Sequence, residues 1–236
     1  MMLRVRDLDV SIQASRILHG VSLDVDAREL VCLVGRNGAG KTTTFRAIMG
    51  YLIPEAGRIE FKNQSLAGLP THAIAARGVG FAPEDSAIFA GLSVAENIEI
   101  ATWTRPEGRP GAERVALAYD VFPKLRGYAA RGGSQLSGGE RKMLSIARAL
   151  ALDPDLLLLD EPFEGLAPAI IPGIRDSIST ITRLGRAVLL AESNIHHVPP
   201  DTNRLYVIER GEIVFAGTPR DAYADATVRR IIGGAA

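Results

Sequence analysis

The chain has 236 residues, of which 47% are hydrophobic, so it can bury a sizeable core as one domain with room for a subdomain. Its 27 basic residues balance 27 acidic ones, and this argues against a nucleic-acid partner, which normally requires a clustered basic excess. No apolar run approaches the roughly 18 residues of a membrane span, and the N-terminus lacks the apolar region of a signal peptide. We therefore expect a soluble, intracellular protein with no direct membrane span, whose single cysteine, Cys32, is a buried free thiol.

The first part of the chain predicts a small antiparallel sheet. Residues 3–10 and 17–25 have strand patterns, and in the second of these Val21, Leu23 and Val25 alternate with polar residues. This alternation is typical of a sheet that buries one face and leaves the other in water.

The next stretch predicts a loop that binds phosphate. After an apolar run at 30–34, which suits a buried strand, residues 35–42 read GRNGAGKT and match the pattern G-x-x-x-x-G-K-[ST] in full. Glycines let backbone N–H groups wrap a polyphosphate, Lys41 reaches its β and γ phosphates, and the Thr42 hydroxyl ligates Mg²⁺. A helix over 43–49 would point the positive end of its dipole at the phosphates. The expected ATP contacts here are Gly35, Asn37, Gly38, Ala39, Gly40, Lys41, Thr42 and Thr43.

The middle of the chain predicts a helical subdomain, from residue 86 to about residue 150, inserted into an α/β core. Before it, strands are predicted at 58–61 and 79–82 and a helix at 71–77. Within it we predict a helix capped by Ser93 and Glu96, a loop over 105–111, a helix over 112–125 and a last helix that ends near Leu150.

The last helix of this subdomain opens with LSGGE at 136–140. Ser137 and Glu140 have the spacing of a capping box, which a purely structural role would explain. Gly138 and Gly139 are unusual in a first helical turn, however, because glycine is a poor helix former. Glycines at a helix start let a phosphate approach the backbone, and Ser137 adds a hydroxyl donor. We therefore interpret Ser137, Gly138, Gly139 and Glu140 as a second phosphate-binding element.

A predicted buried strand, LLLLDE at 156–161, delivers two carboxylates at its C-terminal end, where open α/β sheets bind their ligands. Asp160 suits the Mg²⁺ shell, and Glu161 suits polarising the water that attacks the γ-phosphate. The remaining predicted elements are a helix over 169–184, a strand over 187–191, a hairpin of 205–209 and 212–215, and short helices from 219 and 226.

Together, the phosphate loop, LSGGE and LLLLDE resemble the nucleotide-binding subunit of an ABC transporter, and the resemblance covers essentially the whole chain. It implies an α/β fold: a P-loop NTPase core with an N-terminal antiparallel β-subdomain and the inserted helical subdomain, all in one ATP-binding domain over 1–236. It implies an ATPase that uses ATP and Mg²⁺ and works as a dimer, with each ATP between one subunit's phosphate loop and the other's LSGGE. It also implies transmembrane permease partners, contacted through residues 84–97, and a cytoplasmic location, peripheral on the inner face of the cell membrane.

Three further stretches resemble the ATPase subunits of importers for branched-chain amino acids, or for urea and short amides. They are EPFEGLAP at 161–168, FAPE at 81–84 and the ending around 228–230. This finer resemblance predicts an importer of small polar solutes, in which the second ATPase subunit is either a copy of this chain or a different chain.

Three positions depart from the wider superfamily. Ile12 stands where an aromatic residue would stack on adenine, so we expect weak discrimination between ATP and GTP. Glu84 replaces a glutamine and still offers an oxygen to the metal shell. Ser193, which we predict to be catalytic, replaces a histidine that would contact the γ-phosphate and has a shorter reach. His196 and His197 lie nearby and could compensate, although we expect them in a solvated loop.

The sequence leaves other functions open. A soluble ABC-type ATPase of DNA repair or translation would carry a long coiled-coil insertion or a second such domain, and this sequence has neither. A P-loop metabolite kinase would not explain LSGGE. Ser193 also leaves open a nucleotide-binding module that no longer hydrolyses ATP.

Overall fold

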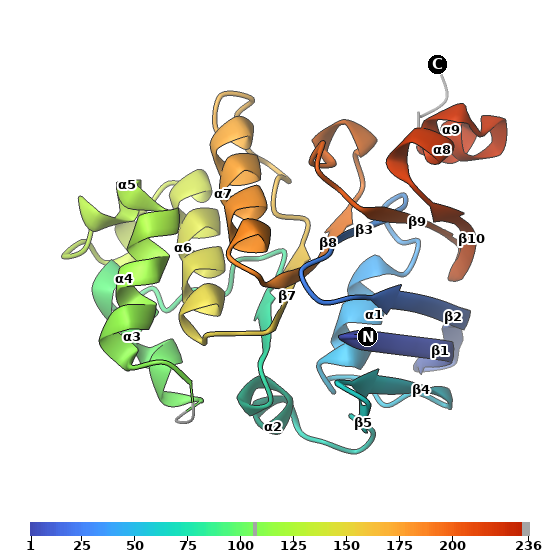
Figure 1. The fold of residues 1–236 in the computed structure, drawn as a ribbon, viewed down its shortest axis with the longest axis horizontal. Coiled ribbons are helices and arrows are strands. Elements are labelled where there is room, and N and C mark those ends of the chain that lie inside the picture. Colours follow the sequence, from blue (N-terminus) through green and yellow to red (C-terminus); the bar gives the residue numbers. More distant parts are fainter. Residues whose placement is uncertain (106–107, 233–236) are drawn as a thin grey trace.

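The computed structural model describes residues 1–105 and 108–232, arranged around two β-sheets (Figure 1). In the described part of the chain the larger sheet has six strands in the order β10-β9-β3-β8-β7-β6. Its strands run parallel except β10, which forms an antiparallel hairpin with β9. They span Leu30–Val34 (β3), Val79–Ala82 (β6), Leu156–Asp160 (β7), Ala187–Glu192 (β8), Arg204–Glu209 (β9) and Glu212–Gly217 (β10). Every residue of β3, β7 and β8 is buried, because layers cover both faces of the sheet, and this explains their continuous apolar runs.

The smaller sheet is antiparallel, as its alternating pattern predicts, with the order β2-β1-β4-β5. Its strands span Leu3–Ile12 (β1), Ser15–Val25 (β2), Ala56–Phe61 (β4) and Gln64–Ser65 (β5). Val21, Leu23 and Val25 are buried while the residues between them are partly exposed, so the predicted half-buried face is confirmed.

One helix, α1 (Lys41–Ile48), packs between the two sheets. Its Phe45 and Ile48 are fully buried in a core that also contains Val5 of β1 and Leu189 of β8. The helix ends before Gly50, whose φ of 73° lies in the left-handed region, as predicted for a glycine that terminates a helix. This packing fixes the start of α1 against the end of β3.

A second core covers the opposite face of the larger sheet, and Figure 1 shows the helices that build it together at the end of the molecule away from the antiparallel sheet. They are α3 (Val94–Glu99), α4 (Gly111–Val121), α5 (Pro123–Arg126) and α6 (Gly138–Ala151), with α7 (Ile171–Arg183) beside them. Short 3₁₀ turns lie at Ile100–Trp103, Gly133–Gln135 and Ile195–His197. Helix α2 (Thr71–Ala76) precedes β6, and α8 (Pro219–Ala224) and α9 (Ala226–Ile232) end the described chain.

The single helix predicted over 112–125 was wrong, because the structure has α4 and α5 with a break at Phe122. Phe122 has φ −124° and ψ 70°, outside the helical region, since the residue before a proline avoids helical backbone angles and Pro123 follows it. The predicted loop over 105–111 is only partly described, because residues 106 and 107 lie outside the described residues.

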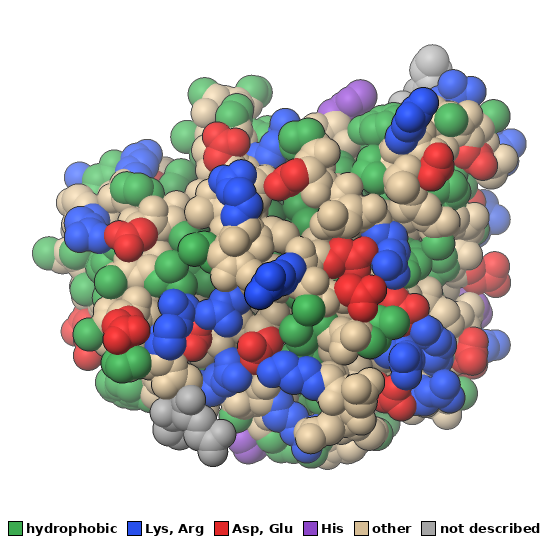
Figure 2. Space-filling view, viewed as in Figure 1, with side chains coloured by type: hydrophobic (Ala, Val, Ile, Leu, Met, Phe, Trp, Pro, Cys, Tyr) green, Lys and Arg blue, Asp and Glu red, His purple; other side chains and the backbone are tan. Residues whose placement is uncertain are grey.

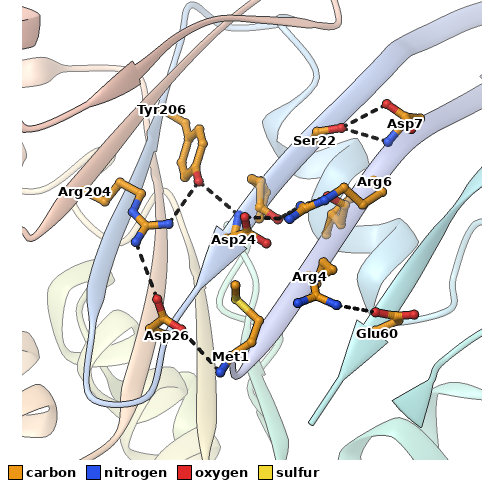
Figure 3. Close-up of polar contacts among 12 residues, drawn as sticks. Met1, Arg4, Arg6, Asp7, Ser22, Asp24, Asp26, Glu60, Arg204 and Tyr206 are labelled. Carbon is orange, nitrogen blue, oxygen red and sulfur yellow. Dashed lines mark hydrogen bonds and ion pairs between the residues drawn. The ribbon is translucent and has the colours of Figure 1, made fainter. Parts of the chain in front are cut away.

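Polar contacts join the antiparallel sheet to strand β9 of the larger sheet (Figure 3). The Tyr206 hydroxyl of β9 accepts hydrogen bonds from the Asp24 backbone N–H at 3.1 Å and from Arg204 at 3.4 Å. The Asp24 carboxylate in turn pairs with Arg6 of β1 at 2.8 Å. The two sheets are therefore tied by directional bonds as well as by the apolar core around α1.

Charged side chains of both signs are interspersed over the face of the molecule in Figure 2, as the balanced composition suggests. Among the described residues, no helix combines the length and the apolar character that a bilayer span requires.

Candidate functional site

The expected nucleotide site lies where β3, β7 and β8 end, because parallel strands bring their C-terminal ends to one edge of the sheet. The loop at 35–40 leaves β3 and leads into α1, and the Gly35 N–H donates to the Glu192 carbonyl at 3.1 Å. A Cβ on Gly35 would collide with the Ile208 carbonyl, so packing against β9 alone requires a glycine there. Gly40, with φ 114°, begins the helix with no side-chain cap. The first N–H groups of α1 are therefore free of a capping side chain.

Lys41 is buried, with 4% of its side chain exposed, and its ammonium is the cation at the centre of this edge. Its Nζ donates to the carbonyls of Gly35 at 2.6 Å and Arg36 at 3.1 Å, which curl the loop around it. It also lies 3.0 Å from Glu161 Oε1. The sequence placed Lys41 and Glu161 in separate motifs, and the fold brings them into contact.

Asp160, at the end of β7, is buried, and neither of its carboxylate oxygens has an aligned hydrogen-bond donor among the described residues. Burial raises the pKa of Asp160 to about 6, although the adjacent Thr42 hydroxyl and Lys41 both act to lower it. A buried carboxylate without donors is costly unless something else satisfies it. These oxygens therefore fit a cation beside Thr42.

Glu161 has a φ of 46°, which is uncommon for a residue with a Cβ, and this turns its side chain away from the strand direction. Its Oε2 accepts hydrogen bonds from the Ser193 backbone N–H at 3.0 Å and from the Ser193 hydroxyl at 3.1 Å. Its Oε1 faces Lys41 but has no aligned hydrogen-bond donor among the residues described. Ser193 thus holds one oxygen of Glu161, while the other pairs with Lys41 and can still accept a hydrogen bond.

A cavity of about 400 Å³ opens at this edge and brings most of the predicted site together. It is lined by Ile12, Ile17, Asn37, Gly38, Gly40, Lys41, Thr42, Thr43, Glu84, Glu161 and Glu164. An adjoining cavity of about 460 Å³ has Thr42, Glu84 and Asp160 in its wall. Ile12 is 39% exposed and lines this cavity from the end of strand β1, and its contact with the base stays a prediction.

The residues of LSGGE lie outside these two cavities. Ser137 caps α6 as predicted: its hydroxyl accepts from the Glu140 N–H, and its own N–H donates to Glu140 Oε2 at 2.9 Å. A Cβ on Gly138 would meet no atom within 4 Å, whereas one on Gly139 would press on Ile170. No packing inside the chain therefore demands a glycine at position 138.

The structure adds two acidic residues that the sequence reading missed. Glu164 lines the main cavity, and burial together with the neighbouring Glu84 carboxylate raises its pKa. Glu192 ends the buried strand β8, and burial followed by repulsion from Glu161 raises its pKa to about 8. A signal for Glu192 was available, because it follows an apolar run just as Asp160 does.

The two histidines near Ser193 differ, and the expectation of a solvated loop was wrong for one of them. His196 is exposed, but the His197 ring packs edge-on against Phe163 with its side chain 21% exposed. Its Nδ1 lies 3.4 Å from Glu192 Oε2. The 3₁₀ turn at Ile195–His197 folds this ring back toward the sheet, which periodicity in the sequence does not predict.

No group of three or more His, Cys, Asp or Glu side chains is placed to hold a metal within residues 1–105 and 108–232. Mg²⁺ that binds together with a nucleotide takes one or two protein ligands and completes its shell with phosphate oxygens and water. Thr42 and Asp160 are the pair whose positions suit it.

A family model described as ABC transporter matches residues 18–164. The lipopolysaccharide export system ATP-binding protein LptB of Haemophilus influenzae is 35% identical over 231 residues, which cover 97% of this chain and 95% of that protein. The chain belongs to the ABC transporter family. A structure of the ATP binding subunit of an ABC transporter has a TM-score of 0.84 with 26% identity and covers 98% of this chain and 95% of its own. A nucleotide-free ATP-binding cassette has a TM-score of 0.85 with 24% identity, over 99% of both chains, which supports the fold.

This protein is therefore the ATP-binding subunit of an ABC transporter and an ATPase. Subunits of this family dimerise and work with transmembrane permease components. The predicted fold, a P-loop core with an antiparallel β-subdomain and a helical region, is confirmed.

Proposed function

We propose that this subunit binds Mg-ATP in the cavity at the end of β3 and hydrolyses it with Glu161 as the residue that polarises the attacking water. Lys41 and the N–H groups of the loop at 35–43 would hold the phosphates, while Thr42 and Asp160 would hold Mg²⁺, with Glu84 offering a further oxygen. The observation that carries this proposal is the pair of buried carboxylates beside Lys41 and Thr42. In the described part of the chain neither Asp160 oxygen has an aligned hydrogen-bond donor, and Glu161 Oε1 has only its ion pair with Lys41.

Ser193 would act through Glu161 and not through the γ-phosphate. Its N–H and hydroxyl both donate to Glu161 Oε2, so they hold the carboxylate with its other oxygen toward the cavity. Steady-state ATPase measurements on Ser193→Ala, Ser193→His and His197→Ala test this role. We expect Ser193→Ala to lower kcat by about tenfold, because one of two donors is lost. Parental turnover in Ser193→Ala combined with collapse in His197→Ala would assign the role to the histidine instead.

The LSGGE element would bind the γ-phosphate of ATP held by a second subunit. Gly138 faces open space, and Ser137, Gly138, Gly139 and Glu140 lie outside the cavity of their own chain, which supports a ligand that arrives with a partner. Light scattering on Glu161→Gln with and without Mg-ATP tests the dimer. A monomer under both conditions at tens of micromolar protein would count against a homodimer and favour a heterodimer of two ATPase subunits.

The permease subunits would dock on the segment 84–97 and the apolar hollow beside it. A cavity of about 350 Å³ there is lined by Tyr51, Phe81, Phe89 and Ile100, among others, and Phe89 is 48% exposed. Such exposed aromatic side chains around a hollow favour a protein interface. The subunit would then lie in the cytoplasm, peripheral on the inner face of the cell membrane.

For the transported solute we propose a branched-chain amino acid or a related small polar solute, imported into the cell. The stretches 81–84 and 161–168 support this choice through their resemblance to such importers. A second candidate is export of lipopolysaccharide, favoured by the 35% identity to LptB. Purification of the subunit with its membrane partners and identification of those partners decides between the two. A small-solute permease would support the first, and an envelope export complex would refute it.

A further inference from the structure

Lys142 is a buried cation that the roles described above do not use. It lies one turn into α6, two residues after LSGGE, and only 5% of it is exposed. Its ammonium donates to the Glu84 carbonyl at 2.6 Å and to the Glu161 carbonyl at 3.0 Å. Three separate segments, namely α6, the loop after β6 and the end of β7, thus meet at one side chain.

Packing alone does not explain a lysine at this position. Its neighbours along the helix, Leu144, Ser145 and Ile146, are buried, and burial lowers the pKa of Lys142, although the Glu84 and Glu164 carboxylates oppose that shift. An apolar side chain of similar length would fill the same space without the cost of desolvating an ammonium. The residue is therefore best explained by the hydrogen bonds that its ammonium makes.

The Glu161 peptide that Lys142 contacts has an unusual conformation. With φ at 46° it lies in the left-handed region, which a residue with a Cβ adopts only where the surroundings hold it. Its N–H donates to the Ala191 carbonyl at 3.0 Å, and its carbonyl accepts from Lys142 and from the Glu164 N–H. This conformation sends the Glu161 side chain toward Lys41 and Ser193.

We propose that Lys142 is a positioning residue for ATP hydrolysis, which fastens the Glu84 and Glu161 carbonyls to helix α6 and so aims the Glu161 carboxylate. The inference rests on the proposed function, in which Glu161 acts on the attacking water. Because α6 begins with LSGGE, the same side chain makes the aim of Glu161 depend on where that helix lies. Lys142 touches no substrate in this scheme and transfers no proton.

The first test compares kinetics of Lys142→Met with those of the parent. Met fills similar space but donates no hydrogen bond, so kcat should fall by about tenfold or more while the KM for ATP stays within about twofold. Lys142→Gln keeps a hydrogen-bond donor, so its kcat should fall less than that of Lys142→Met. If thermal unfolding shows that Lys142→Met does not fold, Lys142→Gln takes its place in the test. The control is Arg126→Gln, which breaks an exposed ion pair with Asp120 and does not line the cavity, so it should keep the parental rate.

The second test asks whether Lys142 acts through Glu161. In the Glu161→Gln background, single-turnover ATP cleavage should not fall further when Lys142→Met is added, because two residues that act as a unit are not additive. A multiplied loss in the double variant would overturn the inference, as would a parental kcat in Lys142→Met. If Glu161→Gln alone turns over ATP at the parental rate, the proposed function itself fails, so the two failures are distinguishable.

Discussion

The two ends of strand β7 hold pairs of carboxylates in opposite electrostatic surroundings. Before the strand, Asp153 pairs with Arg109 at 2.6 Å and with Arg186, and Asp155 pairs with Lys62 at 2.7 Å and Arg105 at 2.9 Å. At the C-terminal end of the strand, Glu161 pairs with the Lys41 ammonium at 3.0 Å, and the Lys142 ammonium is taken up by backbone carbonyls. Oxygens of Asp160 and Glu161 there have no aligned hydrogen-bond donor in the described structure.

The pKa values of the acids follow this difference. Burial alone would raise the pKa of Asp153, but hydrogen bonds from Arg109 and the charge of Arg186 lower it to about 2. At the other end, burial raises the pKa of Asp160 to about 6. The carboxylates before β7 are matched by cations and stabilise the fold, whereas those at its C-terminal end have fewer donors and are the ones proposed to act on Mg-ATP.

The largest expected effect is on ATP turnover, and it comes from a change at the C-terminal end of β7. Glu161→Gln should lower kcat for ATP hydrolysis by about 10³-fold, because the amide cannot polarise water as a carboxylate does. ATP affinity and the midpoint of thermal unfolding should stay near the parental values. A phosphate-release assay beside a nucleotide titration measures both. If Glu161→Gln turned over ATP at the parental rate, the functional role of the carboxylates at the C-terminal end of β7 would be contradicted.

Asp153→Ala should lower the stability of the fold and leave ATP binding unchanged. Removing this carboxylate leaves Arg109 and Arg186 without their common partner, and we expect a loss of about 3 kcal/mol in the free energy of unfolding. ATP affinity should not change at temperatures where the variant is folded. Urea unfolding measures the loss, and the control is Asp120→Ala, whose exposed ion pair should be worth less than about 1 kcal/mol. Equal losses in the two variants would contradict the stabilising role of Asp153.

Lys41→Ala should weaken ATP binding by about a hundredfold, since it removes the ammonium that faces the expected phosphate position. It should also leave the buried Glu161 carboxylate without its cation, so we expect a loss of about 3 kcal/mol in the free energy of unfolding, and affinities are compared at temperatures where the variant is folded. Arg58→Ala, which lies on the antiparallel sheet with 63% of its side chain exposed, is the matched control for the loss of one positive charge. Unchanged affinity in Lys41→Ala would refute the assignment of the phosphate loop.

The last effect is measured as a change of stability with pH, and it concerns Glu192, which extends the comparison to strand β8. Its pKa is raised to about 8 in the folded chain from an ordinary value of 4.5, so the folded state holds this proton where the unfolded state has lost it. The associated stability is fully present below pH 4.5 and is lost as the pH rises through about 8, with a slope of up to about 1.4 kcal/mol per pH unit. Glu192→Gln should lack this slope. Urea unfolding from pH 5 to 8 measures it, and parallel curves for both proteins would contradict the shift.

Much of this site could be predicted from the sequence because its parts are local motifs. Each motif depends on neighbours within a few residues of the chain, so the spacing of residues in the sequence predicts its geometry. This holds for the loop at 35–42, the capping box at Ser137 and the acids that follow LLLL. The order of strands and helices was predicted for the same reason, since apolar runs and alternating patterns distinguish buried from half-buried strands.

Only the tertiary structure decided which of these groups meet and which remain unpartnered. Lys41 and Glu161 are far apart in sequence, and they meet because the parallel sheet gathers strand ends from distant parts of the chain. Lys142 and Glu84 meet because helix α6 packs beside the loop that follows β6. The same is true of His197, which a 3₁₀ turn folds against Phe163, and of Ser193, which reaches Glu161 from the neighbouring strand. The sequence alone determined the chemical groups that enter the site, while their distances, burial and charge balance arose from packing between elements that spacing cannot relate.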